Sequence, residues 1–412
     1  MSGALPPEQQ NLTAHAIETY VPPPPAQRSG IALCLSGGGY RATLFHLGAL
    51  RRLHELGILQ QIDEITSVSG GSITNAFLAH AVATVARAGR TLSFEADVAS
   101  PVRCFTSRNI RTSAILRRML PWNWVRDDTA VRALASAYAR ALPDFACIGL
   151  PQHPNFVFCA TDLSFGVNWV WERTRIGDYD AGYKTPTAVD AVATAVASSS
   201  CFPPIFNPLR PNVNPSELTG GRYDKPDRAK CIRGLRLTDG GNYDNLGLEP
   251  VWKRRAIVLV SDGGGPFEYS ADQGFLWRVQ RYSDVMYRQV GALRRRWLIS
   301  NFISGQLRGT YWGVAGDVKN YDPNALGYSG EISNDLIAQI RTDLDSFSDA
   351  EAAVLENHGY ALTEAGIQRH LSFMVRTPGR FRAPHEDWDW SHADRVRAAL
   401  ADSKHRKILG RF

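Results

Sequence analysis

Apolar and polar positions follow two alternating patterns along most of the chain. Compact apolar runs, typical of buried strands, occur at 30–35 (GIALCL), 62–68 (IDEITSV), 155–164 (NFVFCATDLS), 234–241 (GLRLTDGG) and 256–264 (AIVLVSDGG). Between these runs, apolar residues recur at helical spacing over 42–57, 70–88 and 188–199. This alternation predicts an α/β fold in which helices cover both faces of a mostly parallel sheet.

The same pattern divides the chain into a tail and one large domain. Residues 1–28 are polar and include the run VPPPP, which predicts an extended N-terminal tail. We expect residues 29–412 to form a single domain, with a core over about 29–270 and a mostly helical extension over about 271–412 that ends in a helix. Residues 205–235 are rich in Pro, Asn, Gly and Arg and predict a long surface loop beside the functional site.

Three consecutive glycines, Gly37, Gly38 and Gly39, lie where the first predicted strand passes into a helix. Glycine permits close approach of other groups, and a helix N-terminus presents unpaired N–H groups, so this turn predicts an anion site. A bound nucleotide is disfavoured, because Ala42 stands where a dinucleotide fingerprint needs glycine and no Gly-Lys-Ser/Thr follows. A transient oxyanion and a tight turn without a ligand remain as alternatives.

A candidate nucleophile follows the second predicted strand, in the run Ser67-Val68-Ser69-Gly70-Gly71. The run matches the G-x-S-x-G elbow with Ser67 in place of the first glycine, since a sharp strand-to-helix turn needs small residues on both sides of the serine. Ser69 is then the nucleophile. A serine-rich helix N-cap is the alternative interpretation.

A serine hydroxyl needs a general base, and Asp239 in the run T-D-G-G is the candidate. Burial can raise the pKa of a carboxyl group enough for it to accept the serine proton. A simple turn is the alternative interpretation of D-G-G, and a second copy of the run begins at Asp262. The two runs alone do not decide which aspartate is the base.

Together these runs resemble the patatin-like phospholipases, in their bacterial branch and, more distantly, the catalytic domains of cytosolic phospholipases A2. The resemblance covers about residues 29–270, including the block from Ala197 to Phe206 and the run DGGNYDNLGLEP with Asn245. It implies a three-layer α/β/α sandwich with a mostly parallel central sheet and added C-terminal helices. It further implies that Gly37, Gly38 and Gly39 form an oxyanion hole, and that Ser69 and Asp239 form a catalytic dyad without a metal or an organic cofactor. Because the run that follows Asp239 resembles the family's continuation, Asp262 is given a structural or rim role. Arg41 matches the end of the glycine motif and either binds substrate or anchors the loop.

The rival mechanism is an α/β-hydrolase triad in the chain order Ser, Asp, His. Of the ten histidines only His358, in ENHGYA, combines this order with a loop-like setting. No sequence motif connects His358 to Asp239 or to Asp262. A lipid-binding scaffold without catalysis is a further alternative, which the presence of both Ser69 and Asp239 disfavours.

Charge and aromatic residues bear on the substrate and its location. The net charge of +6 is small for this length and indicates a preference for anionic surfaces more than a nucleic-acid footprint, and membrane headgroups fit it as well as nucleic acid does. The runs at 103–126 and 277–302 combine arginines with aromatic residues, which is typical either of an interfacial anchor or of an ordinary packed helix. For 277–302 we expect packing. A lipid ester substrate, peripheral membrane contact and a cytoplasmic location follow, although secretion without a signal would leave no mark in the sequence.

Overall fold

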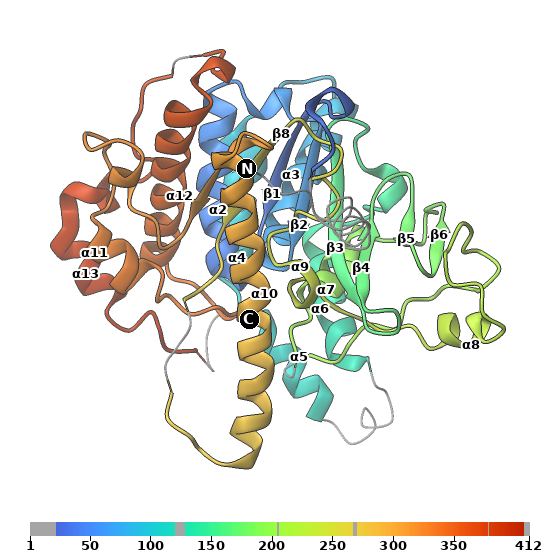
Figure 1. The fold of residues 1–412 in the computed structure, drawn as a ribbon. Coiled ribbons are helices and arrows are strands. Elements are labelled where there is room, and N and C mark those ends of the chain that lie inside the picture. The colour runs from blue at the N-terminus through green and yellow to red at the C-terminus, as the bar shows by residue number, and fades with distance from the viewer. Residues whose placement is uncertain (1–21, 120–127, 204–205, 267–269, 378, 408–412) are drawn as a thin grey trace, which may run out of the picture.

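The computed structural model describes residues 22–119, 128–203, 206–266, 270–377 and 379–407 (Figure 1). Its strands are β1 Ile31–Leu35, β2 Glu64–Val68, β3 Asn155–Asp162, β4 Val167–Trp171, β5 Ile176–Asp178, β6 Gly182–Lys184, β7 Leu237–Asp239, β8 Ile257–Asp262 and β9 Arg308–Gly313. They form one sheet in the order β6-β5-β4-β3-β2-β1-β8-β9, and β7 pairs with β3. The strands from β9 to β3 are parallel, whereas β4, β5, β6 and β7 pair antiparallel.

Helices occupy both sides of this sheet. They are α2 Gly39–Glu55, α3 Gly70–Arg87, α4 Ser100–Thr106, α5 Ile110–Met119, α6 Thr129–Ala141, α7 Val192–Ser200, α8 Arg228–Arg233, α9 Gly241–Asp244, α10 Phe275–Ile303, α11 Gly330–Ile332, α12 Asp349–His370 and α13 Ala393–Leu400. In Figure 1, α10 lies in front of the sheet, and α2 and α12 lie together to its left. Among the described residues, no helix has the length and the apolar run needed to cross a bilayer.

The alternation of side chains along β1 separates two hydrophobic cores. Leu33 and Leu35 join the large core, which also contains the apolar residues of α2, α3, α7 and α12. Ala32 and Cys34 join a smaller core on the other face, together with Leu298 of α10. A strand side chain that points to one face is followed by one that points to the other, so β1 is buried on both faces. This arrangement confirms the predicted α/β class with a sheet between helical layers.

The extension after residue 270 is part of the same structure. Helix α12 packs along α2, and the two helices approach closely at Gly48 and Gly359, where an added Cβ would come within 1.8 Å of Glu356 O and 1.9 Å of Phe45 O. Strand β9 continues the sheet beside β8. The expectation of a mostly helical extension therefore missed a strand, because the six residues of β9, RGTYWG, include two glycines and form no compact apolar run.

The two ends of the chain and the loop at 205–235 differ in part from what the sequence predicts. Most of the tail predicted for residues 1–28 lies outside the described residues, while Pro25–Gln27 forms a 3-10 turn. The final helix α13 ends at Leu400, and residues 401–407 continue without helix. The loop predicted at 205–235 begins beside β7, where Leu209 pairs with Leu237, and then contains α8.

Candidate active site

Ser69 lies in a strained turn between β2 and α3. Its backbone has φ 50° and ψ −118°, a conformation that non-glycine residues rarely adopt. The next two residues must be small, because an added Cβ would lie 2.0 Å from Gly39 O at Gly70 and 2.3 Å from Leu35 O at Gly71. The turn thus holds the serine against the glycine-rich loop, as the elbow motif predicts.

The departure from the motif at Ser67 has a clear structural basis. Ser67 is the penultimate residue of β2, and its hydroxyl donates to Val157 O at 3.0 Å. The same oxygen accepts hydrogen bonds from Ser72 Oγ at 3.0 Å and from Asn75 Nδ2 at 2.9 Å. A serine therefore fits where the motif has glycine, and its hydroxyl binds the elbow to the neighbouring strand and helix.

Asp239 ends β7 and is 1% exposed. Its Oδ1 accepts the backbone N–H of Gly241 at 2.8 Å, whereas its Oδ2 makes no well-aligned hydrogen bond within the described part of the chain. Burial raises the pKa of Asp239 to about 7, and hydrogen bonds from Gly241 N–H and from the Ser69 hydroxyl oppose this shift. The fold thus brings the carboxyl group and the serine together from strands far apart in sequence.

Ser199 in α7 connects the two turns. Its Oγ accepts the backbone N–H of Ser69 at 2.9 Å and donates to Cys159 O at 2.6 Å. Its carbonyl oxygen accepts the N–H of Gly240 at 3.2 Å. One buried residue thereby fixes both the serine turn and the aspartate turn. Sequence reasoning noted the serine block but assigned Ser199 no role.

The glycine-rich loop lies directly against Ser69, since an added Cβ on Gly37 would be 3.0 Å from Ser69 Cβ. The N–H of Gly37 already donates to Asn245 O at 3.1 Å. Gly38 and Gly39 have φ 147° and 56°, and the described residues supply no acceptor for either of their N–H groups. Two of the three glycine N–H groups are thus available at the start of α2.

Arg41 is buried beneath the loop, at 2% exposure. Its guanidinium donates to Ala338 O at 3.0 Å, to Ile340 O at 2.7 Å, and twice to Gly263 O at 3.1 and 3.2 Å. These carbonyl contacts join the glycine loop to two later segments of the chain. Of the two roles considered for Arg41, the geometry favours loop anchoring.

Asp262 and His358 have other surroundings. Asp262 accepts Tyr311 OH at 2.8 Å through Oδ2, which also lies 3.4 Å from Arg295. The loop-like setting expected for His358 is wrong, because the residue is fully buried inside α12. Its Nε2 pairs with Val314 O at 2.9 Å, and burial lowers its pKa to about 4. Helix α12 is buried on several sides, so its sequence lacks the one-sided apolar periodicity that would have predicted the burial of His358.

Tyr287 in α10 is a neighbour of the site that sequence reasoning missed. An added Cβ on Gly241 would lie 2.7 Å from its hydroxyl oxygen, and its ring makes an edge contact with Phe202 at 5.7 Å between centroids. Burial, and then the charge of Asp239, raise the pKa of Tyr287 well above its usual range. Only the tertiary position of α10 reveals this neighbour, which no local motif marks.

The patatin-like phospholipase family matches residues 33–252, more than half of the chain. The chain therefore belongs to the patatin-like phospholipase family, a class of lipid acyl hydrolases. No curated protein matches it in sequence.

Several solved structures are similar to the chain at low identity. VipD from Legionella pneumophila is 13% identical with a TM-score of 0.37, over 84% of this chain and 67% of VipD. Human GIVD cytosolic phospholipase A2 with methyl gamma-linolenyl fluorophosphonate is 12% identical with a TM-score of 0.44, over 85% and 60% of the two chains. The type III effector ExoU is 13% identical with a TM-score of 0.28, over 85% and 54%. The chain thus spans less than two thirds of the matched phospholipase A2 and ExoU chains.

Proposed function

We propose that the chain is a serine acyl hydrolase that cleaves fatty-acyl esters of phospholipids or lysophospholipids with a Ser69–Asp239 dyad. The observation that carries the proposal is the position of a buried carboxyl group with a pKa raised to about 7 at the hydroxyl of a serine on a strained turn. A carboxylate with this pKa is a stronger base than an ordinary one and is still ionised in half of the molecules near neutral pH. No histidine is needed for the proton transfer.

The reaction proceeds through an acyl-serine intermediate. Asp239 accepts the Ser69 proton while Oγ attacks the ester carbonyl carbon, and the carbonyl oxygen becomes an oxyanion. The N–H groups of Gly38 and Gly39 donate to this oxygen, where each preorganised donor is worth about 3 kcal/mol of barrier. Protonated Asp239 then gives its proton to the departing alcohol. In the second half, Asp239 accepts a proton from water, whose oxygen attacks the acyl carbon. The bond to Ser69 Oγ then breaks, Asp239 returns the proton to Oγ, and the fatty acid leaves.

Turnover by Ser69→Ala tests this proposal. On a soluble short-chain ester the variant should lose at least about 10³-fold in kcat, because the nucleophile is gone while the packing around the turn stays. Ser107→Ala is the matched control, since Ser107 is a partly exposed serine whose hydroxyl donates to Cys104 O. Hydrolysis by Ser69→Ala at the control's rate would identify a different nucleophile. A wild-type chain that binds lipid vesicles without turnover would favour the scaffold alternative.

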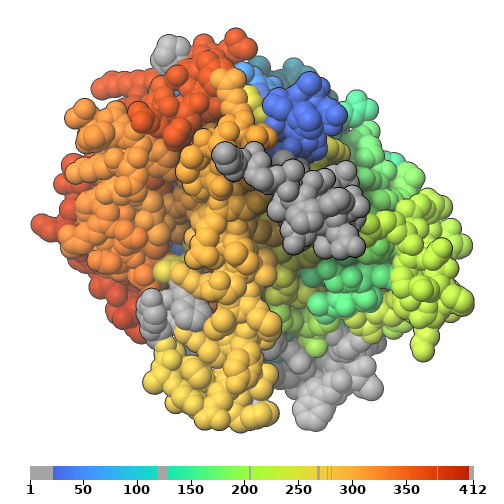
Figure 2. All heavy atoms as spheres, in the orientation of Figure 1, coloured from blue at the N-terminus to red at the C-terminus, as the bar shows by residue number. Residues whose placement is uncertain are grey.

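Helix α10 carries the surface that contacts lipid in this proposal. The expectation that 277–302 packs is wrong for the first half of α10, in which four apolar side chains at helical spacing are 50% exposed or more: Phe275, Val279, Tyr282 and Met286. Leu293, two turns further along the helix, is 59% exposed. Figure 2 shows α10 in yellow and orange at the surface of the molecule. The helix carries six arginines against one aspartate. An apolar stripe on a cationic helix matches an anionic lipid surface.

This surface lies beside the site, because Tyr287 on the same helix reaches Gly241. Docking of the stripe on a bilayer would therefore bring the dyad close to the ester bonds of the lipid. The other run, at 103–126, contributes α4 and α5, but its Trp122 and Trp124 lie outside the described residues. We therefore propose α10 as the main contact.

Vesicle binding tests the contact. The double variant Tyr282→Ser/Met286→Ser should co-sediment about tenfold less with anionic phospholipid vesicles while it retains turnover on a soluble ester. Leu326→Ser is the matched control, because Leu326 is 59% exposed on another part of the molecule. Equal sedimentation of variant and control would exclude the stripe. A dimeric wild type that the double variant makes monomeric would instead identify an interface between two copies.

A further inference from the structure

The loop at residues 338–343 forms the support under the oxyanion loop. The N–H of Tyr40 donates to Asp343 O at 2.9 Å, and an added Cβ on Gly39 would lie 2.6 Å from the same oxygen. Arg41 donates to the carbonyl groups of Ala338 and Ile340. Because Asp343 O occupies the N–H of Tyr40, the N–H groups available at this helix start are those of the preceding glycines. This support lies beyond residue 252, where the family match ends.

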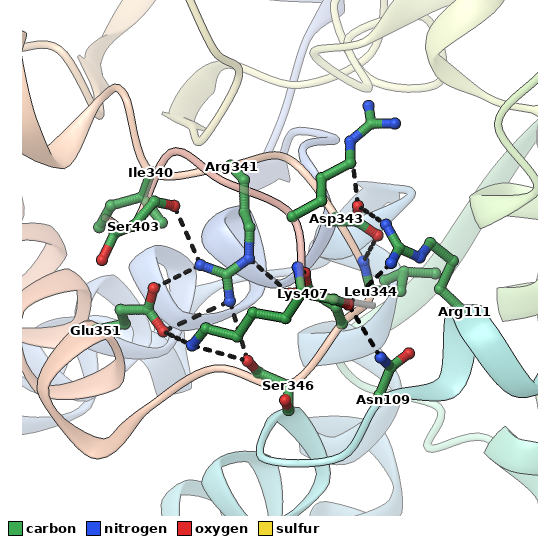
Figure 3. A network of polar contacts seen from close by, with 12 residues as sticks. Asn109, Arg111, Ile340, Arg341, Asp343, Leu344, Ser346, Glu351, Ser403 and Lys407 are labelled. Atoms are coloured by element: carbon green, nitrogen blue, oxygen red, sulfur yellow. Dashed lines mark hydrogen bonds and ion pairs between the residues drawn. The ribbon is translucent and has the colours of Figure 1, made fainter. Parts of the chain in front are cut away.

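Arg341, which belongs to the loop at 338–343, holds this loop in place through contacts of its side chain and its backbone (Figure 3). Its side chain is 2% exposed and pairs with Asp345 at 2.6 Å and with Glu351 at 2.5 Å. Its backbone N–H and its Nη1 both donate to Ser403 O, at 3.0 and 3.1 Å. Although burial acts in the opposite direction, Arg341 brings the pKa of Glu351 down to about 2, so the pair is ionised at neutral pH.

Lys407 completes the cluster from the C-terminal end. Its Nζ lies 3.1 Å from Glu351, and its backbone N–H donates to Asp345 at 2.5 Å. Its carbonyl oxygen accepts Asn109 Nδ2 at 3.2 Å and Arg111 Nη2 at 2.9 Å. The end of the described chain therefore holds both the support loop and the start of α5, as Figure 3 shows.

The side chain of Asp343 joins the same network. It pairs with Arg111 at 2.5 Å and lies 3.3 Å from Nε of Arg406, whose side chain is 60% exposed. The residue whose backbone supports Gly39 is thus tied through its carboxylate to residue 406. Removal of Arg111 would leave the buried carboxylate of Asp343 without its buried cationic partner.

We propose that residues 403–407 form a C-terminal clasp that positions the oxyanion loop for catalysis. Arg341 and Lys407 are its positioning residues, and neither touches the substrate. The chain of contacts runs from Lys407 Nζ through Glu351 to Arg341. Arg341 belongs to the segment 338–343, whose backbone lies against Gly39 and accepts hydrogen bonds from Arg41. This inference rests on the proposed hydrolase function, and it makes the extension after residue 270 a required part of the catalytic unit.

The test uses Lys407→Met in the full chain, with a soluble ester as substrate. The variant removes the contact between Lys407 Nζ and Glu351. It should lower kcat about tenfold with KM within about twofold, since a displacement of the glycine N–H groups by well under 1 Å weakens their hydrogen bonds to the transition state. The affinity for an arylboronic acid, which forms a tetrahedral adduct on a serine, should fall by a similar factor. Lys407→Arg should restore most of both. A merely structural role would lower stability without moving boronate affinity.

Arg397→Met is the matched control, because Arg397 lies in α13 near the same end and pairs with Glu331 at the surface, at 2.9 Å. It should keep wild-type kcat and boronate affinity. Folded Lys407→Met with unchanged kcat and boronate affinity would overturn the clasp while leaving the dyad intact. Wild-type protein without Ser69-dependent turnover would overturn the proposed function instead. If Lys407→Met does not fold, Arg406→Met carries the same test through Asp343, with the same two outcomes.

Discussion

The molecule contains two D-G-G turns, at Asp239 and at Asp262, that are locally almost identical. Each aspartate ends a strand and is at most 3% exposed. In each turn the N–H of the second glycine donates to Oδ1 of the aspartate, at 2.8 Å from Gly241 and at 2.9 Å from Gly264. The first carboxylate oxygen therefore does not distinguish them.

The second oxygen does distinguish them. Oδ2 of Asp262 accepts the Tyr311 hydroxyl and lies 3.4 Å from Arg295. Oδ2 of Asp239 has no well-aligned partner among the described residues, and the hydroxyl of Ser69 is the side-chain group that acts on this carboxyl. A carboxylate already occupied by a cation and a phenol is a poor base, whereas an unoccupied buried one is available for proton transfer. The chemistry of a D-G-G turn is thus decided by tertiary neighbours.

Exchange of each aspartate for asparagine gives the largest contrast between the turns. We expect Asp239→Asn to lower kcat about 10²–10⁴-fold, because it removes the only base of the dyad. Asp262→Asn should stay within about tenfold of wild type, since its amide oxygen can still accept the Gly264 N–H. Both variants are measured on one soluble ester at one pH, with circular dichroism as the control for folding. Equal losses in the two variants would remove the distinction between the turns.

The pH dependence sharpens the same contrast. Asp239 acts as a base only when it is deprotonated, and burial raises its pKa to about 7. The value of kcat/KM should therefore be flat above this pKa and should fall about tenfold per pH unit below it. The break should stay in place in Asp262→Asn. A break near the ordinary aspartate pKa of about 4 would show that Asp239 is not the base that titrates.

Ser199→Ala tests whether the connection between the elbow and the aspartate turn matters. The variant removes the acceptor of the Ser69 N–H and should lower kcat about tenfold, with KM nearly unchanged. Ser198→Ala is the matched control, because its buried hydroxyl donates to Ala195 O within the same helix. If the two alanine variants have equal kcat, Ser199 has no positioning role.

The smallest effect on turnover is expected for His358→Gln. His358 contacts Val314 O and the rings of Phe45 and Tyr328, none of which belongs to the serine or aspartate turn. The variant should keep kcat within a few-fold of wild type, although thermal unfolding should occur at a lower temperature because a buried ring is replaced. A loss of 10²-fold or more in the folded variant would support the triad.

Local sequence patterns predicted strands β1, β2, β3, β7 and β8 and the turns at Gly37, Ser69 and Asp239, because apolar runs and small residues at sharp turns are local requirements. They did not predict β4, β5, β6 or β9; the run RGTYWG of β9 includes two glycines and is not a compact apolar run. The role of Arg41 depended on carbonyl groups almost 300 positions away, at Ala338 and Ile340. The same holds for Tyr287 and Lys407, since contacts of long sequence separation leave no motif around either partner.

Labelling with a fluorophosphonate, followed by peptide mapping, tests the dyad most directly. The reagent attacks an activated serine, so the label should be found on Ser69 in the wild-type chain. Its rate of incorporation should fall strongly in Asp239→Asn and stay near the wild-type rate in Asp262→Asn and His358→Gln. A label on another serine, or equally fast labelling of Ser69 in Asp239→Asn, would contradict the proposed dyad.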